Sequence, residues 1–191
     1  MPEAITQDLV NKFVNSAHCD LGTVQKMLDE SPELLNQRSN QDESAIQAAA
    51  HTGQKHIVEF LLQKGAPLDV CAAALLGRKE DVQRLLEGNR SQSVATGAHG
   101  IPLAFYGALG GDIATVEVLH DHGVDLNAGK DIQTALHASV MANKPEVASW
   151  LLAHGARPDI KNYSGQTSLE FAVQLKRTDL LAVLDGAPIS L

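Results

Sequence analysis

The feature that most limits what this chain folds into is an internal repeat. Apolar residues that open short helical stretches recur with spacings of 33, 24, 33, 33 and 33 residues, at Phe13, Ile46, Val70, Leu103, Leu136 and Leu169. Fifteen residues after each of them stands an aliphatic side chain, and seven residues after most of them stands a residue that tolerates a left-handed turn. One phase that fits several columns indicates a repeat protein, whose units bury their apolar faces against their neighbours.

Each unit is predicted to be a pair of short helices joined by a turn. The first helix opens at the apolar residue, and small side chains three residues later let a neighbouring helix approach closely. The second helix carries apolar residues three and four apart, as over 57–62, which together form one helical face. Ser44, Thr134 and Thr167 stand where a hydroxyl caps a first helix. Pro102 suits a first helical position, where its lack of an N–H costs nothing.

These units resemble the ankyrin repeat family. That family's unit is 33 residues long and opens its first helix with a Thr-Pro-Leu-His signature. The matching tetrads here are Ser44-Ala45-Ile46-Gln47, Ile101-Pro102-Leu103-Ala104, Thr134-Ala135-Leu136-His137 and Thr167-Ser168-Leu169-Glu170. Two leucines, two variable residues and Gly-Ala end the second helix at 61–66 and 151–156, as in that family. The resemblance covers nearly the whole chain. It implies an all-α ankyrin-repeat solenoid of about six helix-turn-helix units with short β-turn or hairpin connections, in which His137 is a structural histidine that bridges neighbouring turns.

We therefore expect a single ankyrin repeat domain over 1–191, with repeats at approximately 1–37, 38–68, 69–94, 95–127, 128–160 and 161–191. The spacing of 24 residues between Ile46 and Val70 predicts that the third repeat lacks its projecting hairpin. The polar, Gly/Ser-rich segment 88–100 predicts an extended loop, and Gly110-Gly111 indicates an irregularity of about one residue in the fourth repeat. Whether the short third repeat is functional or neutral stays open at this point.

Composition disfavours several classes of function. Lys and Arg number 15 against 23 Asp and Glu, a net charge of −8, which speaks against binding nucleic acid. The longest apolar run, Val70 to Leu76, is far shorter than the about 20 residues of a membrane span, so we expect no membrane partner. Two cysteines make no disulfide framework, and the first residues show no basic patch followed by an apolar block. These features predict a cytoplasmic protein, which we expect to be a monomer.

The resemblance places binding of another protein on the concave side, along the hairpin tips and the exposed face of each first helix. Carried onto this chain, it predicts the contact residues Asn40, Gln41, Glu43, His51, Leu75, Leu76, His99, Leu109, Lys130, Asp131, Gln133, Met141, Tyr163, Gln166 and Leu175. The apolar members would form a strip in a polar frame, which is a usual sign of a partner site. In the alternative interpretation, neighbouring loops fold over Leu75 and Leu76 and make them core.

Metal binding and catalysis have weak support in the sequence. His18 and His51 occupy equivalent positions in adjacent repeats, with backbones about 10 Å apart. A structural zinc site uses four ligands at close spacing, and the chain has no paired Cys/His set, so we expect no metal and no cofactor. Motifs for a nucleophile or a phosphate loop are also absent from the sequence, which predicts that the protein is not an enzyme. The alternative function is a small-molecule sensor or an enzyme with a pocket at the third repeat, near Leu75, Leu76 and His99.

Overall fold

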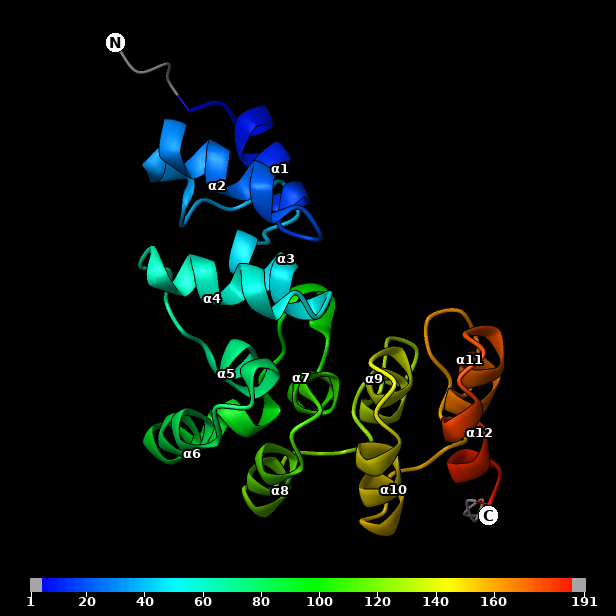
Figure 1. Cartoon of the computed structure of the whole chain (residues 1–191). Coiled ribbons are helices and arrows are strands. Elements are labelled where there is room, and N and C mark those ends of the chain that lie inside the picture. Colours follow the sequence, from blue (N-terminus) through cyan, green and yellow to red (C-terminus); the bar gives the residue numbers. More distant parts are fainter. Residues whose placement is uncertain (1–4, 187–191) are drawn as a thin grey trace.

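The computed structural model describes residues 5–186, which form a curved stack of helix pairs (Figure 1). The pairs are α1 (Gln7–Ser16) with α2 (Leu21–Glu30), α3 (Ala45–His51) with α4 (Lys55–Gln63), α5 (Val70–Leu76) with α6 (Lys79–Gly88), α7 (Leu103–Gly110) with α8 (Ile113–Asp121), α9 (Ala135–Met141) with α10 (Pro145–Ala153), and α11 (Ser168–Gln174) with α12 (Thr178–Asp185). The 3-10 helices η1 (Pro32–Leu34), η2 (Arg90–Val94) and η3 (Ala98–Gly100) lie between pairs. Over 5–186 the only strand pairing consists of isolated bridges, so the predicted all-α solenoid of about six units is confirmed.

The predicted first and last repeats, 1–37 and 161–191, extend beyond the described residues. The start of the chain, on which the cytoplasmic prediction partly rests, also lies outside them. Within 5–186, no helix combines the length and the apolar character needed to span a membrane.

Local sequence explains where the first helices begin. Ser44 and Thr167 each cap a helix through a capping box, in which the side chain three residues later returns a bond to the cap backbone. Thr6 caps α1 through its hydroxyl alone, which accepts the backbone N–H of Leu9, so this helix begins at Gln7 and not at Phe13 as predicted. Pro102 stays extended at φ −72° and ψ 155°, so α7 begins at Leu103, one residue later than predicted.

His137 closes the cap of α9 and also links two repeats. Its Nδ1 accepts the backbone N–H of Thr134 at 3.4 Å and lies 2.8 Å from the Thr134 hydroxyl. Its Nε2 lies 3.0 Å from the carbonyl oxygen of Gln166 in the next hairpin. A neutral imidazole with its proton on Nε2 satisfies all three contacts. The structural role that the resemblance implies for His137 is therefore confirmed.

The core follows the repeat, with a shift of one residue in the third and fourth units. Most of the column fifteen residues after each anchor is buried, but Leu85 and Val118 are only half-buried. Leu86 and Leu119 take their places, with 1% and 0% of the residue exposed. In the fourth unit the cause is the longer α7 followed by Gly111 in the left-handed region at φ 81°, which confirms the predicted irregularity.

The third repeat has no hairpin, as predicted. Only residues 64–69 separate α4 from α5, and the antiparallel bridges lie at Arg38–Ser44 before α3 and at Thr96–Pro102 before α7. The stack bends at this point, with α1 to α4 in one arm, α9 to α12 in the other, and α5 to α8 at the corner (Figure 1). The segment 88–100 is not an extended loop, because η2 and η3 shorten it and η3 packs back against α3.

The second and fourth repeats consequently touch each other directly. Lys55 on α4 donates a hydrogen bond from Nζ to the carbonyl oxygen of Gly110 at 2.7 Å, and a Cβ on Gly53 would lie 3.5 Å from Leu109. Leu109 is 6% exposed and Leu75, which lies between the two repeats on α5, is 0% exposed. The prediction that Leu75 and Leu109 belong to an exposed apolar strip is therefore wrong, and Leu75 is core, as in the alternative interpretation, although α5 packs mainly against helix α7 and not under a loop.

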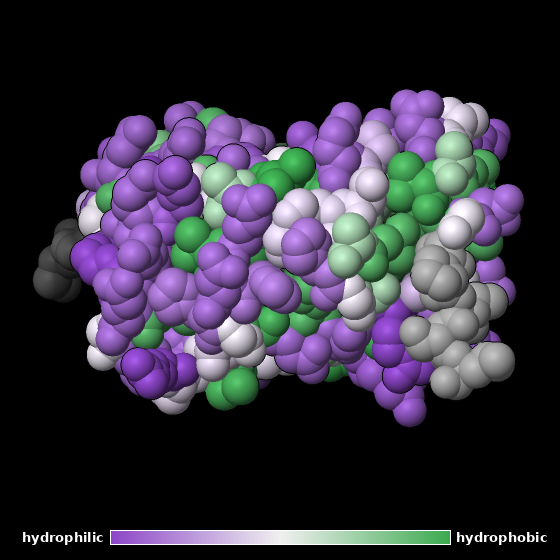
Figure 2. Space-filling view, turned by 90° about the horizontal axis from the view of Figure 1, so that it is seen from below, coloured by the Kyte–Doolittle hydropathy of each residue, from purple (hydrophilic) through white to green (hydrophobic). Residues whose placement is uncertain are grey.

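The outer side of the stack is mixed in character. Seen from below, on the side where α6, α8 and α10 lie, the surface is largely hydrophilic towards the N-terminal arm (Figure 2). Hydrophobic side chains gather towards the C-terminal arm in the same view. A pocket lined by side chains from several repeats lies on the opposite, concave side of the stack.

Candidate functional site

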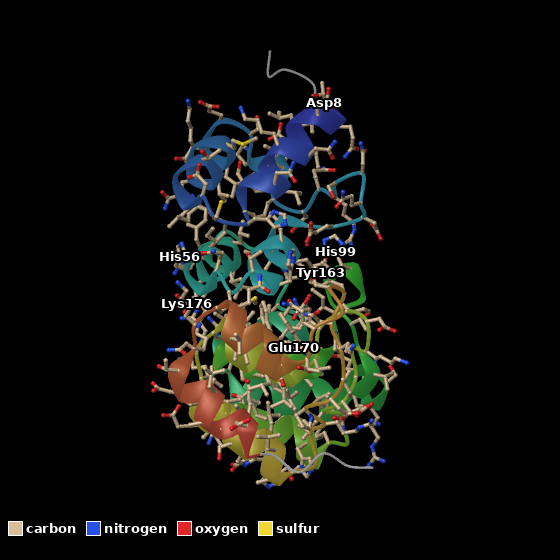
Figure 3. All side chains as sticks on the ribbon, turned by 90° about the vertical axis from the view of Figure 1, so that its right-hand side faces the viewer. Asp8, His56, His99, Tyr163, Glu170 and Lys176 are labelled. Atoms are coloured by element: carbon tan, nitrogen blue, oxygen red, sulfur yellow. The ribbon has the colours of Figure 1, made fainter. Side chains whose placement is uncertain are left out.

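The two arms border a hollow on the concave side, which we call the concave pocket. Its volume is about 580 Å³, and its lining residues are His51, Thr52, His99, Ile101, Phe105, Asp131, Ile132, Gln133, Met141 and Tyr163. They come from the end of α3, from the hairpins that precede α7, α9 and α11, and from α7 and α9 themselves. Viewed from the C-terminal arm, His99 and Tyr163 stand at the same level between the two arms (Figure 3). Four repeats and a bend are thus needed to build the pocket.

An apolar wall lines the C-terminal side of the concave pocket. Tyr163 is 71% exposed, which is unusual for so large an apolar side chain, while Ile132 and Met141 are half-buried. The hairpins that carry Tyr163 and Ile132 are joined by backbone hydrogen bonds, from Tyr163 N–H to Ile132 at 3.0 Å and from Asp131 N–H to Lys161 at 2.9 Å. Hydrogen bonds between the two hairpins therefore fix the backbone that carries the exposed aromatic ring.

The polar groups of the concave pocket are few. Asp131 is exposed on its hairpin and is the one carboxylate among the described lining residues, which include no lysine or arginine. Gln133 is 8% exposed, and its Oε1 has no hydrogen-bond partner among the described residues. The hydroxyl of Thr52 donates to the carbonyl oxygen of Ala48 at 2.8 Å. This set suits recognition of an apolar group beside a cation and offers no nucleophile paired with a base.

A second group of side chains, the Glu43 cluster, stands at the N-terminal edge of the concave pocket and consists of Glu43, His18, His51 and His99. Oε1 of Glu43 lies 3.0 Å from His51 Nδ1 and 3.6 Å from His99 Nε2. Oε2 of Glu43 lies 3.7 Å from His18 Nε2. The centroid of the His51 ring lies 5.0 Å from that of His18 and 5.2 Å from that of His99, and both pairs are edge-to-face. Three repeats meet in this cluster.

The environment of Glu43 is dominated by burial and by these imidazoles. Its residue is 3% exposed. Burial works to raise the pKa of the Glu43 carboxyl, but the close approach of His51 at 3.0 Å and the electrostatic effect of the three imidazoles hold that pKa below its usual value. The Nδ1 atom of His51 also lies 3.1 Å from the carbonyl oxygen of Gln47, which has the better hydrogen-bond geometry, and Glu43 Oε1 is left without a hydrogen bond.

Comparison with known proteins decides the family. A family model described as ankyrin repeats in three copies matches residues 68–162 and 103–189, and a single ankyrin repeat model matches 41–73. The chain belongs to the ankyrin repeat family. Ankyrin repeats generally act as protein–protein interaction modules, and the family is generally one of non-catalytic repeat proteins.

Several curated proteins resemble this ankyrin repeat chain over part of their length. It is 31% identical over 145 residues to ankyrin repeat and SAM domain-containing protein 6 of Danio rerio, covering 75% of this chain and 19% of that protein. It is 28% identical over 151 residues to ankyrin repeat domain-containing protein SAT10 of Stachybotrys chartarum, covering 73% of this chain and 8% of that protein. It is 24% identical over 191 residues to oxysterol-binding protein homolog 1 of Saccharomyces cerevisiae, covering 93% of this chain and 15% of that protein. The chain thus spans less than a fifth of the length of each of these relatives.

The concave pocket of this ankyrin repeat domain gathers only part of the predicted contact set. It brings together His51, His99, Asp131, Gln133, Met141 and Tyr163. The predicted residues that do not line it are Asn40, Gln41, Glu43, Leu75, Leu76, Leu109, Lys130, Gln166 and Leu175. Asn40, Gln41 and Lys130 are exposed elsewhere on their hairpins, whereas Leu76, Gln166 and Leu175 are half-buried. Of the three residues expected near the alternative pocket at the third repeat, His99 lines the concave pocket, whereas Leu75 and Leu76 do not.

Ile101, Phe105 and Ile132 line the pocket and were not anticipated from the sequence. One signal was present for Ile101, because it stands where Ser44 and Thr134 cap their helices and an apolar residue cannot cap. For Phe105, which is 1% exposed yet borders the hollow, the sequence carried no signal, since a core side chain looks the same.

Proposed function

We propose that this ankyrin repeat domain binds a segment of another protein in the concave pocket, and that the segment presents an apolar side chain next to a basic residue. The observation that carries the proposal is the exposed ring of Tyr163 beside the half-buried Ile132 and Met141, inside a hollow of about 580 Å³. Exposed aromatic side chains in such settings are typical anchors of protein interfaces.

Charge supports the basic character of the partner. Asp131 is the one carboxylate among the described lining residues, and no lysine or arginine among them opposes it. The chain as a whole carries a net charge of −8, which favours encounter with basic surfaces. The proposed basic residue therefore lies against Asp131 while the apolar anchor contacts Tyr163.

Rigidity is the second source of affinity. The hairpins are fixed by capping boxes and by backbone hydrogen bonds between neighbouring hairpins. A surface that is ordered before association loses little conformational entropy on binding, so the contacts at Tyr163 add to affinity with a small entropic cost.

A displayed library of random peptides, selected against the purified chain, tests the proposal. We expect a consensus of one large apolar residue next to Lys or Arg. Tyr163→Ala is expected to weaken binding of the selected peptides by about 30-fold, the effect of losing a hot-spot residue worth about 2 kcal/mol. Asp131→Asn, which tolerates the left-handed backbone at φ 61°, is expected to weaken only peptides that contain the basic residue.

Val94→Ala is the matched control, because Val94 is 80% exposed and lies outside the concave pocket. Peptides that bind Tyr163→Ala as tightly as the wild type, or that lose binding equally in Val94→Ala, would contradict the proposal.

A small molecule is the second candidate occupant, since the volume of about 580 Å³ lies within the usual range for ligand pockets. The peptide selection separates the two candidates. If no selected peptide binds the concave pocket, and apolar small molecules protect Tyr163 from solvent in fluorescence quenching, the result favours a small molecule.

A further inference from the structure

The Glu43 cluster has the donor set of a metal centre. His18, Glu43 and His51 each offer one ligand atom, and these atoms lie within 4.8 Å of one another. His99 adds a fourth side chain on the other flank of His51. We propose that these four residues bind one Zn²⁺ ion at the edge of the concave pocket, which His51 and His99 also line.

Distances between the donor atoms suit a tetrahedral ion. Zinc–nitrogen and zinc–oxygen bonds of about 2.0–2.1 Å place neighbouring ligand atoms about 3.3 Å apart in a tetrahedron. The Glu43 oxygens lie 3.0 Å from a nitrogen of His51, 3.6 Å from His99 and 3.7 Å from His18. The ligand atoms of His18, Glu43 and His51 therefore already lie near a shared position, and His99, which is close to Glu43 but outside that group, completes the shell by turning its exposed side chain towards the ion.

Glu43 itself points to a ligand. Its residue is 97% buried, since only 3% is exposed, and its Oε1 has no hydrogen-bond partner among the described residues. A buried carboxylate oxygen without a partner is costly, and such groups are regularly satisfied by an ion or a hydrogen bond. A Zn²⁺ ion bound at Oε1 would supply the missing interaction.

The histidines are already oriented by their own helices. Nδ1 of His18 lies 3.1 Å from the carbonyl oxygen of Asn15, and Nδ1 of His51 lies 3.1 Å from that of Gln47. When Nδ1 of His18 donates its proton to the Asn15 carbonyl, its Nε2, the nitrogen 3.7 Å from Glu43, carries a lone pair that is free to bind a metal. In His51 the nitrogen 3.0 Å from Glu43 is Nδ1 itself, so this ring would bind the ion through Nδ1 and give up its contact with Gln47. Zinc-binding histidines characteristically use one nitrogen for the metal and donate the other N–H to a carbonyl or carboxylate.

The chemistry favours zinc over harder cations. Calcium and magnesium prefer shells made only of oxygen, whereas imidazole nitrogen with one carboxylate suits Zn²⁺. The expectation of no metal rested on the lack of a paired Cys/His set in the sequence. The structure adds Glu43, from the hairpin before α3, and His99, which comes close to the second repeat where the third hairpin is missing. The ion would join the first, second and fourth repeats across that gap.

Zinc binding by the whole chain tests the proposal. The purified protein is stripped with a chelator and titrated with Zn²⁺ by calorimetry, with bound metal counted by mass spectrometry and the melting temperature recorded in parallel. We expect one Zn²⁺ per chain and a rise in melting temperature that increases with free Zn²⁺ concentration. Glu43→Gln and His51→Gln are each expected to weaken Zn²⁺ binding by more than about tenfold, because even outer-shell changes reach that size.

His99→Gln covers the case in which the buried variants fail to fold, because the His99 side chain is 46% exposed. It is also expected to weaken Zn²⁺ more than about tenfold. The control is His120→Gln with His154→Gln, a second group of neighbouring histidines with ring centroids 5.4 Å apart, which is expected to bind Zn²⁺ as the wild type does. Three results would each overturn the proposal. The wild type could bind less than one Zn²⁺ per chain, His99→Gln and His51→Gln could bind Zn²⁺ as tightly as the wild type, or only the control variant could lose Zn²⁺ binding.

Discussion

Replacing Gly110 by alanine tests whether the close approach of α5 and α7 shapes the concave side. A Cβ on Gly110 would lie 2.5 Å from the carbonyl oxygen of Leu75 and 2.8 Å from that of Ala74. Both contacts involve backbone atoms, which cannot rotate away, so the ends of α5 and α7 must separate by about 0.5 Å to restore a tolerable distance of about 3 Å.

The expected effect is a loss of about 2 kcal/mol in the free energy of unfolding. Overpacking of this kind costs about 1–3 kcal/mol, and backbone contacts belong at the upper end of that range. The higher helix propensity of alanine returns less than about 1 kcal/mol at a helix end. For a chain of this size the melting temperature should fall by about 4–8 °C. Urea unfolding followed by circular dichroism measures the change.

Gly88→Ala is the matched control, because Gly88 ends α6 and a Cβ there meets nothing within 4 Å. We expect Gly88→Ala to be neutral or stabilising by up to about 1 kcal/mol. Equal unfolding free energies for Gly110→Ala and Gly88→Ala would refute the claim that the backbones of α5 and α7 are in contact at Gly110.

Three further changes probe buried polar groups. Tyr106→Phe removes a buried hydroxyl that has no partner among the described residues, so the free energy of unfolding should stay the same or rise by up to about 1 kcal/mol. A lower urea midpoint would show that the hydroxyl has a partner. Lys55→Met keeps the aliphatic stem but removes the bond to Gly110, which should cost about 1–3 kcal/mol, and an unchanged midpoint would show that this bond contributes nothing. Burial holds the pKa of His137 below its usual value, so the unfolded chain gains a proton near about pH 6.5 that the folded chain does not, and stability should fall as the pH drops below about 7. His137→Gln should lose this part of the pH dependence of the unfolding free energy, and equal slopes in the two proteins would contradict the assignment.

The sequence by itself determined the features that depend on short-range interactions. Helix pairs, their turns and the caps at Ser44 and Thr167 follow from hydrogen bonds between residues a few positions apart. The missing third hairpin follows from a deletion that is visible in the spacing of the repeats. Hairpin residues such as Tyr163 and Asp131 could be placed near the concave side because the units that have a hairpin are expected to present it there.

Only the tertiary structure decided what happens where the repeat is broken. Residues of the second repeat meet residues of the fourth, as Lys55 meets Gly110 and Glu43 meets His99. These contacts depend on the angle at which whole repeats stack after a hairpin is removed, and no local pattern encodes that angle. For this reason Leu75 and Leu109 turned from expected surface into core, and a pair of histidines became a cluster of four ionisable groups around a buried carboxylate.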